Sequence, residues 1–208
     1  EMPQRPIISA FTATATTQVK EDILQLLDMN DPYTITTGFD RKNLYFAVEK
    51  PKDKYQALLQ YVKNNTEYAG IVYCLSRKTV EEVCEHLCSD GFAATRYHAG
   101  LSDEERMRNQ DDFIYDRKPI MVATNAFGMG IDKSNVRFVV HFNMPKNMES
   151  YYQEAGRAGR DGEAADCILL YSGKDVRLNQ FLIEQGSGHE DMDEDTRMEL
   201  LQKEKDRL

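Results

Sequence analysis

The sequence predicts an α/β fold in which a parallel sheet of about six strands carries helices on both faces. Short apolar runs of strand length recur along the chain, and segments with helical periodicity lie between them. The runs in the middle are nearly continuously apolar rather than alternating, which is typical of strands buried on both faces. Alternation of strand and helix favours a parallel sheet with right-handed crossovers.

The predicted strands are runs of four or five mostly apolar residues. They cover residues 44–48, 71–74, 93–97, 120–123, 138–142 and 167–171.

Three of the intervening segments carry helix signals. Apolar residues from Tyr55 to Val62 follow the spacing i, i+3, i+4, i+7, and the same spacing runs from Val80 to Cys88. Ser102 and the glutamate three residues later form a capping-box pattern that opens the third helix. Gly91 marks the end of the second helix.

Residues 1–38 lie outside this pattern. We expect a strand from Ile7 to Ala15, then a helix with one apolar face, which Asp31 and Pro32 end. That face comprises Val19, Ile23, Leu26 and Leu27.

Composition excludes several classes of protein. The chain has 208 residues, a net charge of −9 and 41% hydrophobic residues, which fits one domain with additions or two small domains. It has no apolar run of the roughly 18 residues that a membrane helix needs, and no signal-peptide pattern, so we expect no membrane partner. The acidic balance argues against coating nucleic acid through bulk charge but leaves room for a local basic groove.

The last stretch, residues 186–208, differs in composition. It opens on Gly-Ser-Gly and holds eight acidic and four basic side chains, which account for −4 of the net charge. We expect a flexible joint followed by a solvated helix or frayed tail rather than a binding element.

The four cysteines, Cys74, Cys84, Cys88 and Cys167, are too scattered for a disulfide scaffold. Cys84 and Cys88 are one helical turn apart, but no second ligand pair has zinc spacing. We therefore expect small, buried, reduced core residues and no metal. Reduced thiols without an export signal favour a cytoplasmic location.

Polar and small residues follow four of the predicted strands. Ligands of open parallel sheets bind beyond the carboxyl ends of the strands, where glycines and hydroxyls let a phosphate chain approach the backbone. An elongated anionic ligand such as a strand of nucleic acid fits four such tips better than a small metabolite does. The tips begin at Leu75, His98, Thr124 and Asn143.

The segment from Tyr151 to Gly162 carries the sharpest signal. On a helix, Arg157 and Arg160 share a face, and two forked guanidiniums favour a phosphate target. Gly156 and Gly159 would lie inside that helix, where each costs about 1 kcal/mol, so we expect a close approach to the backbone. The alternative is a pair of surface arginines bonded to the neighbouring acidic residues at positions 154 and 161.

The chain looks like one half of a phosphate site. It has no G-x-x-x-x-G-K-[ST] phosphate loop and no Asp-Glu pair at the end of an apolar strand that could hold Mg²⁺. No Ser–His–Asp or Cys–His arrangement has supporting context.

At the strand tips and in the segment with the two arginines, the sequence resembles the RecQ family of superfamily 2 helicases. The resemblance covers residues 5–185, with the family's motifs in order. The matching segments are 11–15 (motif III), 39–44 (the domain junction, with Lys42 in place of the usual proline), 70–77 (motif IV), 97–101 (motif IVa), 122–133 (motif V) and 153–162 (motif VI).

The resemblance implies part of an ATP-driven 3′→5′ DNA helicase of repair and recombination. It implies a remnant of the first RecA-like domain at 1–38, the second RecA-like domain at 39–185 and an acidic tail at 186–208. ATP and Mg²⁺ would be held mainly by the first domain of the same polypeptide, which is itself a partner, and this chain alone would be inactive. Single-stranded or duplex DNA would be the other partner.

The resemblance also assigns roles. It makes Arg160 the arginine finger and Arg157 its helper, which are the catalytic residues. The residues implied on the nucleotide side are Gln153, Gly130 and Asp132. The residues implied in contacts with the DNA backbone are Ser76, Arg77, His98, Gly100, Thr124 and Asn125.

Two alternatives stay open. One is another superfamily 2 motor, such as an RNA helicase of the DEAD-box type, although those usually carry an arginine where this chain has Met129. The other is a standalone module that docks on a separate ATPase.

Overall fold

The structure is a computed structural model that describes residues 7–12, 17–36, 40–128 and 132–177. The chain divides into two compact units, residues 1–41 and 42–208. The division falls three residues after the predicted domain boundary.

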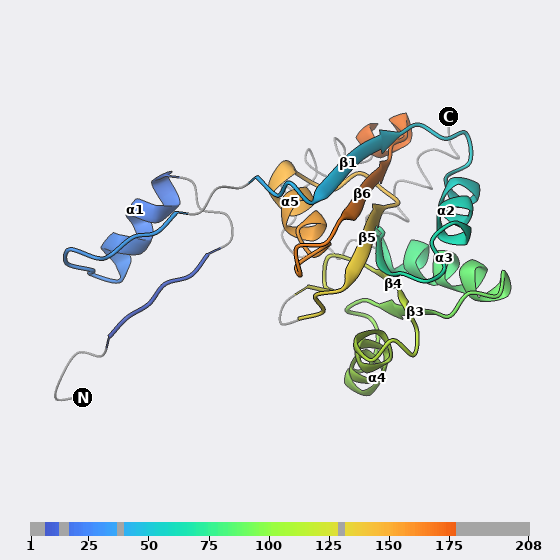
Figure 1. Ribbon diagram of the computed structural model, residues 1–208, viewed down its shortest axis with the longest axis horizontal. Coiled ribbons are helices and arrows are strands. Elements are labelled where there is room, and N and C mark those ends of the chain that lie inside the picture. Colours follow the sequence, from blue (N-terminus) through green and yellow to red (C-terminus); the bar gives the residue numbers. More distant parts are fainter. Residues whose placement is uncertain (1–6, 13–16, 37–39, 129–131, 178–208) are drawn as a thin grey trace, which may run out of the picture. The chain divides into compact units, whose positions relative to one another are not determined.

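The second unit is built on one six-stranded, entirely parallel sheet, as predicted (Figure 1). Its order is β1-β6-β5-β2-β4-β3. Each strand lies within two residues of its predicted bounds. The strands are β1 (Leu44–Glu49), β2 (Ala69–Tyr73), β3 (Ala94–Tyr97), β4 (Ile120–Ala123), β5 (Val136–His141) and β6 (Ala165–Leu170).

Helices cover both faces of this sheet. The helices α2 (Lys54–Lys63) and α3 (Arg77–Ser89) pack on one face, and α4 (Asp103–Ile114) and α5 (Met148–Ala155) belong to the other. Successive residues of a strand point to opposite faces, so Val72 joins the first core cluster and Ile71 and Tyr73 join the second. The result is a three-layer α/β domain.

Local capping sets where these helices begin. Side chains of Asp53, Ser76, Ser102 and Asn147 accept hydrogen bonds from backbone N–H groups in the first turns of α2, α3, α4 and α5. The bond from the Glu105 amide to Ser102 confirms the predicted capping box. Gly91 follows α3 with φ of 89°, a left-handed conformation that suits a helix end.

The prediction of a continuous helix through Gly156 and Gly159 is wrong. The helix α5 ends at Ala155, and Gly156 is its C-cap. Gly159 has φ of 55°, and a Cβ built there would lie 2.6 Å from the carbonyl oxygen of Glu163 and 2.5 Å from Asn43 Nδ2. The backbone is therefore approached closely by the chain itself, whose own turn after α5 requires the glycine.

The first unit contains the predicted helix, α1 (Thr17–Leu26), none of whose residues is buried. Its Lys20 Nζ donates a hydrogen bond to Thr36 Oγ1 at 2.7 Å. The helix ends before Asp28, which has φ of 45°. Residues 7–12 form no strand, because a strand needs a neighbour to pair with. Residues 13–16, the rest of the expected strand, lie outside the described residues.

The remaining expectations concern the membrane, the cysteines and the tail. Among the helices that the structure describes, none is long and apolar enough to cross a bilayer. All four cysteines are reduced, but Cys88 is exposed and only the other three are buried as expected. The acidic tail at 186–208 lies outside the described residues.

Candidate functional site

The four polar strand tips lie beside one another in the sheet. In the order β1-β6-β5-β2-β4-β3, the strands that precede these tips occupy four adjacent places. Because all strands are parallel, their carboxyl ends meet at one edge. This edge carries the segments that begin at Asn143, Leu75, Thr124 and His98.

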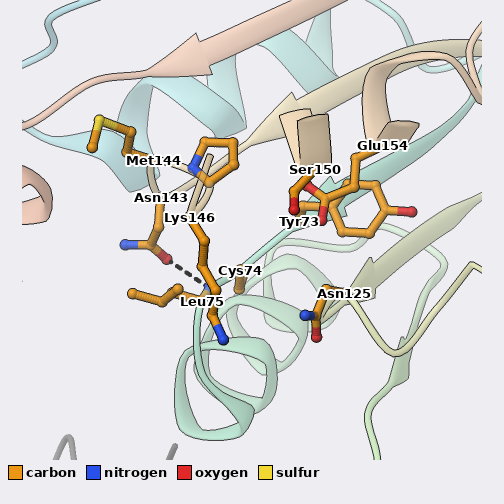
Figure 2. A pocket seen from close by; sticks show the side chains of 10 residues that line it. Tyr73, Cys74, Leu75, Asn125, Asn143, Met144, Lys146, Ser150 and Glu154 are labelled. Atoms are coloured by element: carbon orange, nitrogen blue, oxygen red, sulfur yellow. Dashed lines mark hydrogen bonds between the residues drawn. The ribbon is translucent and has the colours of Figure 1, made fainter. Parts of the chain in front are cut away.

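A pocket opens in this edge between the ends of β2, β4 and β5 (Figure 2). From β2 the chain continues to β3 and β4 on one side of β2, and it then crosses to β5 on the other side. Parallel sheets commonly bind ligands at the point where the strand order reverses in this way. Of the predicted site residues that the structure describes, Asn125 lines the pocket. The lining residues are Tyr73, Cys74, Leu75, Asn125, Asn143, Met144, Pro145, Lys146, Ser150 and Glu154.

Sequence reasoning missed Lys146 and Ser150 as pocket residues. Lys146 brings a positive charge to the rim, and Ser150 lies in the first turn of α5. For Lys146 the available signal was its place directly after the predicted tip Asn143–Pro145. Ser150 has no such signal.

A buried polar network holds the β2 end of the pocket. The Leu75 amide donates to Asn143 Oδ1 at 3.2 Å, as Figure 2 shows, and Asn143 Nδ2 donates to Asp175 Oδ1 at 3.2 Å. Lys54 Nζ donates to Asp175 Oδ2 at 2.5 Å and to the Phe142 carbonyl oxygen at 2.7 Å. The network therefore joins α2, the end of β5 and the helical residues 173–177 after β6 to the segment that precedes Ser76.

Ser76 and Arg77 begin α3 at this edge. The Ser76 hydroxyl is buried and caps the helix by accepting from the Thr79 amide at 3.1 Å. Arg77 extends over Gly100, where an added Cβ would lie 3.1 Å from Arg77 Cδ. The structure thus brings Arg77 and Gly100 together, while the Ser76 side chain has a structural partner.

His98 is also buried and fully engaged. Its Nδ1 accepts from the Gly100 amide at 3.2 Å, and its Nε2 lies 2.7 Å from Glu81 Oε1. Because Nδ1 accepts, Nε2 carries the proton and donates it to Glu81. The imidazole therefore fixes the backbone of Gly100 beside Arg77.

The loop after β4 connects the pocket to the two arginines. Thr124 is buried, and its amide donates to the Tyr97 carbonyl oxygen at 3.1 Å. At the other end, Arg157 Nη1 donates to the Gly128 carbonyl oxygen at 2.6 Å, and Arg160 Nη1 lies 3.9 Å from Asp132 Oδ1. Gly130 lies outside the described residues.

Neither arginine forms the ion pairs that the alternative interpretation required. Asp161 pairs with Arg137, whose hydrogen bond lowers the pKa of that carboxyl group, and Glu154 lies 2.9 Å from His141 Nε2. Arg157 Nε is buried and has no hydrogen-bond partner within the described part of the chain. The loop after β4 therefore holds the Arg157 guanidinium through Gly128, and its Asp132 lies near the Arg160 guanidinium.

Gln153 lies on the exposed side of α5, where its Nε2 donates to Glu149 Oε1 at 3.2 Å. It does not line the pocket.

Comparison with known proteins identifies relatives across this unit. The family model of the helicase conserved C-terminal domain matches residues 53–162. The ATP-dependent DNA helicase RecQ of Bacillus subtilis (strain 168) is 49% identical over 94% of this chain and 33% of its own length. The ATP-dependent DNA helicase hus2/rqh1 of Schizosaccharomyces pombe is 45% identical over 93% of this chain and 15% of its own length.

Solved structures agree on the fold. The structure of S. cerevisiae Dbp5 bound to RNA and ADP BeF3 superposes with a TM-score of 0.66 at 23% identity, over 88% of this chain and 49% of that one. At this identity the likeness shows a shared RecA-like fold. This chain spans about one third or less of the length of the curated relatives described above.

Proposed function

The chain belongs to the helicase conserved C-terminal domain family, in the form found in RecQ-type helicases, and on that premise we propose that it is the second motor domain of an ATP-dependent 3′→5′ DNA helicase. In this proposal it supplies arginines to a nucleotide held by a first RecA-like domain and carries single-stranded DNA across its strand ends. Unwinding serves DNA repair and recombination.

The observation that carries this proposal is the loop after β4. At its start, Asn125 lines the pocket, and at its end Gly128 and Asp132 contact Arg157 and Arg160. The loop after β4 therefore lies both at the strand ends, where nucleic acid would bind, and beside the two arginines, which would face a phosphate. Such a segment can couple the two sites, because in a helicase the bound nucleotide must change the affinity of the protein for DNA.

On the nucleotide side, Arg160 and Arg157 would face the terminal phosphate of ATP. A guanidinium stabilises the negative charge that develops there in the transition state. Arg160 is about a third exposed and so can reach a group outside the domain. In this proposal the first domain would hold most of the nucleotide and its Mg²⁺.

On the DNA side, Arg77 and Lys146 supply positive charge along the edge, and Asn125 and backbone groups supply hydrogen bonds. Such contacts go to phosphates, so binding would be largely independent of sequence and weakened by salt. ATP would close the two RecA-like domains on each other, and hydrolysis would open them, which moves the protein along the strand.

The proposal is tested by ATP turnover of the full-length protein with single-stranded DNA or RNA. We expect strong stimulation by DNA, weak stimulation by RNA, and no turnover by the isolated 208-residue chain. Equal stimulation by RNA would favour the RNA-motor alternative. Hydrolysis by the isolated chain would contradict the division of the site between two domains.

Replacing Gly128 by alanine should impair turnover without unfolding the domain. A Cβ at Gly128 would lie 2.3 Å from Arg157 Nη2, so the guanidinium must move aside. That atom is the end of a flexible side chain, and the fold loses only about 1 kcal/mol, the value of one hydrogen bond. We expect turnover to fall about tenfold or more.

Gly173→Ala is the matched control, because nothing lies within 4 Å of a Cβ at Gly173. Thermal melting and ATP turnover of both variants in the full-length protein separate the two effects. Normal turnover in Gly128→Ala would show that the bond between Arg157 and Gly128 is dispensable.

A further inference from the structure

Tyr73, the last residue of β2, has a buried hydroxyl between the pocket at the strand ends and the loop that contacts the two arginines. Only 3% of the residue is exposed. Its hydroxyl donates to the Phe127 carbonyl oxygen at 2.9 Å, in the loop after β4. A buried tyrosine hydroxyl usually has a hydrogen-bond partner, and here the partner is a backbone carbonyl group of the loop that leads to the arginines.

The hydroxyl acts on the same stretch of loop as Arg157. Tyr73 holds the Phe127 carbonyl oxygen, and Arg157 holds the carbonyl oxygen of the next residue, Gly128, at 2.6 Å. Burial raises the pKa of the Tyr73 hydroxyl well above its usual range, while the nearby Arg157 guanidinium opposes this rise. Two adjacent carbonyl groups are thus fixed from two directions, one by a strand and one by the arginine.

The ring of Tyr73 lines the pocket and also packs on a buried histidine. Tyr73 stacks on His141 with ring centroids 5.6 Å apart and an interplanar angle of 24°, and His141 Nε2 lies 2.9 Å from Glu154 Oε2. Tyr73 and Glu154 both line the pocket, as Figure 2 shows. His141 is 1% exposed, so the stacked face of the Tyr73 ring is shielded from solvent.

We propose that Tyr73 is a positioning residue that couples the DNA pocket to the catalytic arginines, an inference that rests on the proposed function. Its ring is part of the pocket wall and its hydroxyl holds the loop on which Arg157 is anchored. A displacement of the strand end on DNA binding moves the Phe127 carbonyl group and, with it, the anchor of Arg157. DNA then stimulates turnover by placing the arginines.

The test is Tyr73→Phe in the full-length protein, which removes one hydroxyl and keeps the ring and its stacking. The matched control is Tyr61→Phe, because Tyr61 also donates a partly buried hydroxyl hydrogen bond, to Asp166 Oδ2 at 2.7 Å, on the opposite face of the sheet. We expect the ratio of turnover with saturating single-stranded DNA to turnover without it to fall about tenfold in Tyr73→Phe only. The KM for ATP and the affinity for DNA should change far less.

This ratio does not depend on the fraction of folded enzyme, so a purely structural role of Tyr73 would leave it unchanged. Equal ratios in Tyr73→Phe, Tyr61→Phe and the wild type would overturn the positioning role and leave the proposed function intact. A wild-type protein whose turnover DNA does not stimulate would overturn both.

Discussion

Replacement of Arg160 by alanine in the full-length protein is expected to lower ATP turnover by about 10³–10⁵-fold, which corresponds to roughly 4–7 kcal/mol of transition-state stabilisation. Arg160 is the more exposed arginine of the pair, with 37% of its side chain accessible, and its Nη1 lies 3.9 Å from Asp132 Oδ1. An exposed guanidinium at this position can meet a phosphate presented by the other domain. Because the side chain is not part of either core cluster, the fold should persist.

Steady-state ATP turnover and DNA affinity, measured on the same preparation, check this prediction. DNA affinity should stay within about twofold of the wild type, because the strand ends are untouched. Arg117→Ala is a suitable control, since Arg117 is also an exposed arginine beside an aspartate, Asp112, at 2.7 Å. Turnover in Arg160→Ala that matches the control would exclude the finger role.

Replacement of Asp175 by alanine is expected to destabilise this domain by about 3 kcal/mol. The side chains of Asp175 and Lys54 are 7% and 15% exposed, and their charged atoms lie 2.5 Å apart. Removal of the carboxylate leaves the Lys54 ammonium group buried with the Phe142 carbonyl oxygen as a remaining partner. It also frees Asn143 from one of its two anchors.

A double variant separates two costs: the loss of the ion pair between Lys54 and Asp175, and the burial of a Lys54 ammonium group that has lost its carboxylate. Changing Lys54 to methionine together with Asp175 to leucine removes both charges, and stability should return to within about 1 kcal/mol of the wild type. Urea unfolding of this 208-residue chain, followed by circular dichroism, measures both changes. A double variant no more stable than Asp175→Ala would mean that the Asn143 contact, rather than the charge, carries the cost.

The sequence predicted those elements whose signals are local. The bounds of all six strands were predicted to within two residues. Their apolar runs are continuous because strands of a parallel sheet are buried on both faces. Ser102 capped its helix and Gly91 ended one as predicted, since the groups they satisfy are only a few residues away. The resemblance to RecQ-type motifs is confirmed by relatives of high identity.

Predictions failed where a residue's partner is distant in sequence. Two glycines near two arginines suggested a helix with a phosphate against it. The structure ends that helix at Ala155, and Gly159 makes room for Glu163 and Asn43, a residue more than a hundred positions away. The site roles stand differently, because the structure does not test them: the Ser76 hydroxyl is buried and caps α3, and its expected contact with DNA stays a prediction.

The sequence by itself determined the strands, the helices, the caps and the kinds of side chain at each strand end. Only the tertiary structure decided that the four polar tips adjoin, because the order β5-β2-β4-β3 is not the order along the chain. It also decided that Arg157 is held by Gly128 and that Tyr73 reaches the same loop. Periodicity and capping act over a few residues, whereas strand order follows from how the whole chain buries its apolar faces.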